Sequence, residues 1–170
     1  MRRLRRLNRF WGLGKGNLPR PLHEILPRDE NAILWLWTTN ARLRVAFDVL
    51  EAWGFEYKTV LTWVKDRMGT GDWLRGQTEH CLLAIRGKPV FLHANRTTAL
   101  KAARREHSRK PEEFYVLAEA TCPGSKAELF CRQQREGWHD FGNDTQKFKR
   151  EKGSRESCRA ILVEIWASFA

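Results

Sequence analysis

The sequence predicts an α/β domain in which helices cover a mostly parallel β-sheet. Three features lead to this prediction: an apolar run at residues 32–37, a helix-spaced apolar pattern directly after it, and a helix-plus-strand unit at residues 107–130. Buried strands that alternate with helices are typical of such a sheet. A chain of 170 residues with 42% hydrophobic residues is large enough to build one core of this kind.

The first strand and the first helix are expected within residues 32–54. The run from Ala32 to Trp37 contains no polar residue, as expected for a strand that is buried on both faces. The polar residues 38–40 then offer N-caps for a helix, and Gly54 is its expected stop. Between them, apolar residues recur at helical spacing: Leu43, Ala46, Phe47, Leu50 and Trp53.

Three more strands are predicted at residues 58–64, 81–85 and 127–130. The last of them follows a helix that starts at Pro111, carries two acids in its first turn and ends before a Pro-Gly pair. Lys110 stands just before this helix, where a loop cation can meet an anionic ligand. Because ligands of such sheets bind beyond the strand C-termini, this segment is a candidate cofactor cradle.

Two flanking segments differ from this folded block, to which we assign residues 31–145. Residues 1–30 hold five arginines in their first nine positions, followed by Gly and Pro, and are expected to be a basic, loop-rich segment. Residues 146–170 are expected to be a basic linker and an amphipathic C-terminal helix. This helix either docks on the domain's own sheet, which we favour, or forms a homo- or heterodimer contact. Its apolar face comprises Cys158, Ile161, Leu162, Ile165, Trp166 and Phe169.

Charge and cysteine content narrow the function classes. The chain has 31 Lys plus Arg against 20 Asp plus Glu, a net charge of +11 that favours DNA or RNA as a partner, although solubility alone can also explain scattered lysines. The four cysteines form no CxxC pair, which argues against a zinc site and a secreted disulfide framework. No run has the length of a transmembrane helix, so we expect no membrane contact and a cytoplasmic location.

Several short motifs occur in a fixed order along the chain. They are Leu34–Thr39, Leu61–Lys65, Glu79–Leu83, His107–Tyr115, Cys122–Gly124, Glu128–Phe130 and Gly137–Asn143. Taken in this order, the motifs resemble the adenine-N6 methyltransferases of the mRNA-methylating type. The resemblance covers about residues 30–145 and implies a Rossmann-like methyltransferase fold that uses S-adenosylmethionine. The short bacterial and phage members of this family are taken to act on DNA, so DNA is favoured over RNA.

The resemblance also implies roles for individual residues. Lys110 matches the lysine that meets the methionine carboxylate of the cofactor, and Phe130 and Arg132 match a strand-end pair that lies along it. The residues that match the pair holding the adenosine part are Asn143 and Asp144, where Asp144 replaces an amide. Glu79 matches a carboxylate near the target adenine. Without the resemblance, a surface cap or a solvated charge is the favoured interpretation of Lys110 and Asn143, because most exposed polar residues only face water.

One family signature is absent from this sequence. The resemblance places Asp-Pro-Pro-Trp at a strand end upstream of Leu34, where it accepts hydrogen bonds from the adenine amino group and stacks on the base. Residues 5–8 fall at that place, and they are Arg-Arg-Leu-Asn. We therefore expect the motif strand to be missing, one sheet edge to be bare and methylation to be impaired, because positioning drives this reaction.

Three explanations for this absence remain open. The chain is an N-terminally truncated reading frame of an active enzyme, a pseudo-enzyme that supports a partner, or a protein whose motif comes from another polypeptide. The first is favoured, because the cofactor side matches the family while the substrate side does not. An alternative of a different class is a non-catalytic nucleic-acid-binding module. In this module, basic residues would contact the phosphates of a nucleic-acid strand, and the loop aromatics Trp11 and Trp73 would stack on its bases.

Overall fold

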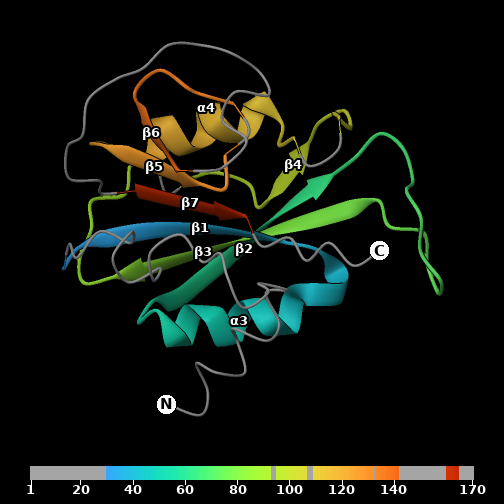
Figure 1. Ribbon diagram of the computed structural model, residues 1–170, viewed down its shortest axis with the longest axis horizontal. Coiled ribbons are helices and arrows are strands. Elements are labelled where there is room, and N and C mark those ends of the chain that lie inside the picture. Colours follow the sequence, from blue (N-terminus) through green and yellow to red (C-terminus); the bar gives the residue numbers. More distant parts are fainter. Residues whose placement is uncertain (1–29, 93–94, 107–108, 132, 142–159, 165–170) are drawn as a thin grey trace, which may run out of the picture.

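A seven-stranded sheet lies at the centre of the structure, with one α-helix packed on each of its faces (Figure 1). This computed structural model describes residues 30–92, 95–106, 109–131, 133–141 and 160–164. The strands follow the order β4-β2-β3-β1-β7-β5-β6 across the sheet. Among these described strands, β3 runs antiparallel to β1 and β2, and every other pairing is parallel. The predicted α/β fold around a mostly parallel sheet is confirmed.

The elements have the following bounds. The strands are β1 (Ala32–Thr38), β2 (Glu56–Val64), β3 (Thr78–Arg86), β4 (Ala99–Lys101), β5 (Lys126–Leu129), β6 (Trp138–Phe141) and β7 (Ala160–Glu164). The helices are the 3-10 helix η1 (Asn40–Arg42), α3 (Leu43–Ala52) and α4 (Glu112–Thr121).

Strand β1 is buried on both faces, as its apolar run predicts, and its side chains alternate between two cores. Ile33, Trp35 and Trp37 pack with α4 residues such as Phe114 in what we call the α4-side core. Leu34 and its even-numbered neighbours pack with α3 in the α3-side core. Because each large apolar side chain contributes about 1.5–3 kcal/mol when fully buried, β1 anchors both layers of the domain.

Helix α3 begins and ends close to the predicted limits, but its start lacks the predicted cap. Thr39 is the N-cap of η1 and makes no side-chain capping hydrogen bond, and Arg42 holds the same position before α3. The predicted stop is confirmed, because Gly54 has a φ of +72° and its amide donates to the carbonyl of Glu51. Only glycine adopts this left-handed conformation without strain.

Residues 160–164 form the inner strand β7, so the C-terminal helix predicted across this segment is wrong for these residues. Strand β7 lies between β1 and β5 and pairs in parallel with both. Ile161 and Leu162 are fully buried, one in the α3-side core and the other in the α4-side core. A short apolar run fits a helix face and a strand buried on both sides equally well. Here the residues form a strand, because their backbone groups pair with both β1 and β5.

Candidate functional site

Polar residues gather at one edge of the sheet, which we call the carboxyl edge. Strands β1, β2, β5 and β7 run in the same direction and end there, whereas the antiparallel strand β3 begins there. Thr38 of β1 stands opposite His80 of β3, and Val64 of β2 stands opposite Thr78. The edge of a sheet beyond its parallel strand ends is the usual ligand site of α/β proteins.

The core of this site is a buried cluster of one acid and two cations, Lys65, Glu79 and Lys110. Lys110 donates from Nζ to Oε2 of Glu79 over 2.9 Å, and Lys65 donates to Oε1 over 2.5 Å. The side chain of Lys110 is 1% exposed and that of Glu79 is 10% exposed. The cluster therefore joins three chain segments: the start of β3, the end of β2 and the loop before α4.

The acid of this cluster stays ionised. Burial by itself raises the pKa of the Glu79 carboxyl, but the charge of Lys110 and the hydrogen bond from Lys65 outweigh it, and the pKa falls below its ordinary value. Glu79 is thus held as a carboxylate between two cationic side chains. Cationic side chains at the edge of a sheet are groups to which an anionic ligand can make charge-assisted hydrogen bonds.

Aromatic rings support both lysines. The ammonium of Lys110 lies 5.0 Å from the ring centroid of Trp37, and that of Lys65 lies 4.8 Å from the ring centroid of Trp63. These distances permit cation–π attraction. Trp37 also has a buried indole N–H that makes no hydrogen bond to any residue within the described ranges. The edge thus combines rigid aromatic walls with polar groups, as ligand sites usually do.

A second charged cluster fixes the loop that carries Lys110. Glu112, in the first turn of α4, accepts hydrogen bonds of 2.6 Å from both Arg105 and Arg135. Burial raises the pKa of Glu112, but these two arginines outweigh that effect and lower it. Arg109 donates to Gln133 over 2.9 Å, which ties the loop before α4 to the segment after β5.

Phe130 follows directly after β5 and has a backbone φ of +63°, in the left-handed region. A residue with a Cβ atom rarely takes this conformation, and residues strained in this way cluster at ligand-binding and catalytic positions. Its side chain is 38% exposed, so an aromatic surface remains accessible at this strand end.

The structure brings together two of the residues that the resemblance singles out, since Lys110 and Glu79 are directly bonded. Phe130 lies at the same edge, beyond β7, at the end of β5. The remaining predicted site residues, Arg132, Asn143 and Asp144, lie outside the described residues. The cofactor and substrate roles assigned to all these residues stay predictions.

Sequence reasoning gave no role to Lys65 or His80. Lys65 directly follows the strand predicted at 58–64, so its place at a strand end was the signal that could have identified it. The ring of His80 contacts Thr62 Oγ1 at 3.0 Å through Nδ1 and Asn40 Oδ1 at 2.6 Å through Nε2. Burial lowers the pKa of His80, although Glu79 opposes the effect. His80, on β3, is therefore uncharged at physiological pH and links this strand by hydrogen bonds to Thr62 of β2 and Asn40 of η1.

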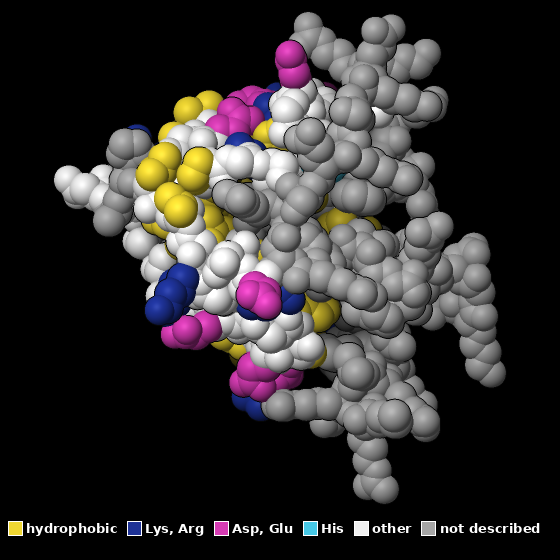
Figure 2. Space-filling view, turned by 90° about the vertical axis from the view of Figure 1, so that its left-hand side faces the viewer, with side chains coloured by type: hydrophobic (Ala, Val, Ile, Leu, Met, Phe, Trp, Pro, Cys, Tyr) yellow, Lys and Arg dark blue, Asp and Glu magenta, His cyan; other side chains and the backbone are white. Residues whose placement is uncertain are grey.

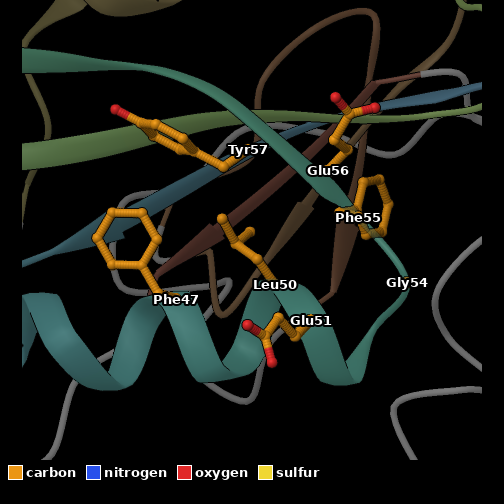
Figure 3. A pocket seen from close by; sticks show the side chains of 7 residues that line it. All are labelled: Phe47, Leu50, Glu51, Gly54, Phe55, Glu56 and Tyr57. Carbon is orange, nitrogen blue, oxygen red and sulfur yellow. The ribbon is translucent and has the colours of Figure 1, made fainter.

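A hollow of about 590 Å³ lies between α3 and the start of β2 (Figure 3), whereas Lys65 follows the other end of this strand. Phe47 and Tyr57 line it and contact each other edge to face, with ring centroids 5.1 Å apart. None of the predicted site residues lines it. Within the described ranges, no group of three His, Cys, Asp or Glu residues is placed to hold a metal ion. None of the helices found there is long and apolar enough to cross a membrane.

The strand order, the two helix layers and the polar carboxyl edge define a Rossmann-like methyltransferase fold. The MT-A70 family model matches residues 18–144, and the chain belongs to this family. Its family is thus that of the S-adenosylmethionine-dependent N6-adenosine methyltransferases.

Three relatives illustrate the extent of the match. An MT-A70-like N6-adenosine-methyltransferase of Arabidopsis thaliana is 36% identical over 147 residues, which cover 79% of this chain and 22% of the relative. The N6-adenosine-methyltransferase catalytic subunit METTL3 of Homo sapiens is 33% identical over 126 residues, 67% of this chain and 22% of that protein. The type II methyltransferase M.MunI of a Mycoplasma species is 33% identical over 117 residues, 66% of this chain and 50% of that enzyme. The chain thus spans between about a fifth and a half of these relatives.

Proposed function

We propose that this protein binds S-adenosylmethionine at the carboxyl edge and transfers its methyl group slowly to the N6 atom of adenine, in DNA rather than RNA. The observation that carries the proposal is the buried cluster of Lys65, Glu79 and Lys110 at the edge of a family-matched sheet. We place this activity in the cytoplasm, because the described cysteines Cys81, Cys122 and Cys131 are buried free thiols, which suit a reducing compartment.

The residues at this edge suit the cofactor. Lys110 carries a cation that can make a charge-assisted hydrogen bond to its methionine carboxylate. Phe130, whose ring is 38% exposed, and Arg132 would lie along the cofactor, and Asn143 and Asp144 would hold its adenosine part. When bound, the cofactor supplies an electrophilic methyl group. The task of the chain is to orient both reactants and to exclude water.

The net charge of +11 supports a nucleic acid as the substrate. On the face shown in Figure 2, the described Lys and Arg side chains lie beside Asp and Glu and form no continuous basic field. The described part of that face is therefore a poor candidate for contact with the phosphate backbone of DNA, and we expect DNA to approach the molecule from another side.

A low rate follows from the missing Asp-Pro-Pro-Trp. A preorganised polar contact in an active site is worth roughly 3 kcal/mol of barrier, about a hundredfold in rate. Loss of the stacking ring weakens the positioning of the base further.

Methyl transfer from labelled cofactor to DNA and RNA strands of matched sequence tests this proposal with the 170-residue chain. We expect adenine-dependent labelling of DNA above RNA, at a rate at least about a hundredfold below a median enzyme turnover of roughly 10 per second. Turnover near that median would show that another residue set fully replaces the motif. Labelling of RNA alone would reverse the choice of substrate.

A second candidate function is a non-catalytic nucleic-acid-binding module. It is favoured by the loop between β2 and β3, where Trp73 is 97% exposed and Leu74 is 88% exposed. An exposed indole next to basic residues is suited to stack on an unpaired base. A pure binding module has no use for the Lys110 cluster, so absence of cofactor binding together with tight binding of single strands would favour it.

A further inference from the structure

The hollow between α3 and the start of β2 has a lining whose charge differs from that of the chain as a whole. Seven described residues line it, and the charged ones among them are Glu51 and Glu56. The whole chain, by contrast, has a net charge of +11. The hollow is therefore a local acidic site on a basic protein, and its charge suits a cationic partner.

The two carboxylates belong to different walls of the hollow. Glu51 lies in the last turn of α3, and Glu56 is the first residue of β2 (Figure 3). Both residues are exposed. Glu56 accepts a hydrogen bond of 2.6 Å from Lys58, in a pair whose side chains are 73% and 40% exposed, respectively. Such an exposed pair contributes little free energy, so a cationic partner can replace Lys58 with little loss.

Three aromatic side chains complete the lining. Phe47 and Tyr57 are 38% and 41% exposed, so part of each ring remains accessible. Phe55 is buried, and the guanidinium of Arg86 lies 4.6 Å from the centroid of its ring. One ring of the lining thus already holds an arginine of the protein itself. A guanidinium stacks on an aromatic ring and also donates to carboxylates in a fixed fork, which an ammonium group cannot do.

We propose that this hollow is a docking site for an arginine-bearing segment of a basic partner protein. One guanidinium lies on the exposed part of Phe47 or Tyr57, and the other cations of the segment pair with the two carboxylates. Because these carboxylates stand on separate walls, a segment with several arginines suits the hollow better than a single small cation does. The volume of about 590 Å³ lies in the range of ligand sites. The site is separate from the carboxyl edge, because Lys65 follows the opposite end of β2.

Binding of fluorescent peptides to the 170-residue chain tests this proposal. The probes are hexa-arginine, hexa-lysine of the same charge, and hexa-citrulline, which has the shape of hexa-arginine without its charge. We expect hexa-arginine to bind more tightly than hexa-lysine and hexa-citrulline not to bind measurably. A single arginine amide that binds as tightly as hexa-arginine would assign the hollow to a small cation and overturn the proposal.

Two double variants locate the contact. Glu51→Gln with Glu56→Gln should weaken the binding of hexa-arginine by roughly two- to thirtyfold, the range for losing two exposed ion pairs. Asp72→Asn with Glu136→Gln is the matched control, because it removes the same charge from exposed acids outside the hollow, and it should keep the native affinity. Equal losses in the two variants, or no binding of hexa-arginine to the native chain, overturn the proposal.

A ring variant separates stacking from charge. Phe47→Leu with Tyr57→Leu keeps both acids, so it should bind hexa-lysine like the native chain and lose the preference for hexa-arginine. The full preference in this variant would overturn the assignment to arginine. If the ring variant does not fold, the charge variants still decide the location, because they replace exposed side chains and leave every ring in place.

Discussion

Two glutamates, Glu79 and Glu112, each form ion pairs with two or more cationic side chains, yet their surroundings differ. Glu79 lies between Lys65 and Lys110 with its side chain 10% exposed. Glu112 lies between Arg105 and Arg135 with its side chain 44% exposed. The same pairing of charges therefore serves two purposes. The exposed cluster ties a loop to its neighbour, whereas the buried one holds two cations beside a carboxylate at the carboxyl edge.

The largest expected effect is the loss of stability when the buried acid is removed. Glu79→Ala leaves Lys110 buried without its carboxylate, and breaking a buried ion pair in this way costs about 3–5 kcal/mol. Glu112→Ala should cost about 1 kcal/mol or less, because water compensates a partly exposed pair. Urea denaturation of both variants and the native chain measures the two differences in the free energy of unfolding.

Salt provides a control for this comparison. The effect of Glu112→Ala should shrink at high ionic strength, while that of Glu79→Ala should change little, since buried pairs are screened less. Equal losses in the two variants would contradict the contrast between the clusters.

The pH dependence sharpens the same contrast. Burial opposes ionisation of both glutamates, but the neighbouring cations prevail and hold both pKa values below the ordinary 4.5. Each carboxylate therefore stabilises the fold above that pH, and its contribution is lost as the pH falls through the lower pKa of the folded state. The difference in unfolding free energy between the native chain and Glu79→Ala should narrow from about pH 6 to about pH 3. A difference that stays constant over this range would contradict a lowered pKa of Glu79.

How far the sequence predicts the structure differs between the inner strands and the two edge strands of the sheet. The run at Ala32–Trp37 fixes β1, because a wholly apolar hexapeptide followed by a helical pattern has few other uses. Local signals also place β2, β3, β5 and both helices. Strands β4 and β6, with three and four residues, are too short to show a period, and tertiary pairing alone creates them.

The candidate site was predictable to a similar degree. The resemblance singles out Lys110 and Glu79 separately, but only the folded sheet shows that they bond to each other and to Lys65. The place of β7 could not be predicted, because its apolar residues are spaced like a helix face. Their partners in β1 and β5 are more than 30 residues away along the chain.

The central claim is that the buried cluster at the carboxyl edge binds S-adenosylmethionine through Lys110. Calorimetric titration of the native chain and of Lys110→Met tests it directly. The matched control is Lys58→Met, because Lys58 is also bonded to a glutamate, Glu56, over 2.6 Å, but in an exposed pair on β2. In Lys110→Met, Glu79 keeps Lys65 as a partner, so the fold should persist.

We expect the native chain and Lys58→Met to bind the cofactor with equal affinity. Lys110→Met should bind it about 1.5–3 kcal/mol more weakly, the range for a hydrogen bond between charged groups. Unchanged affinity in Lys110→Met, or no binding by the native chain, would contradict the claim.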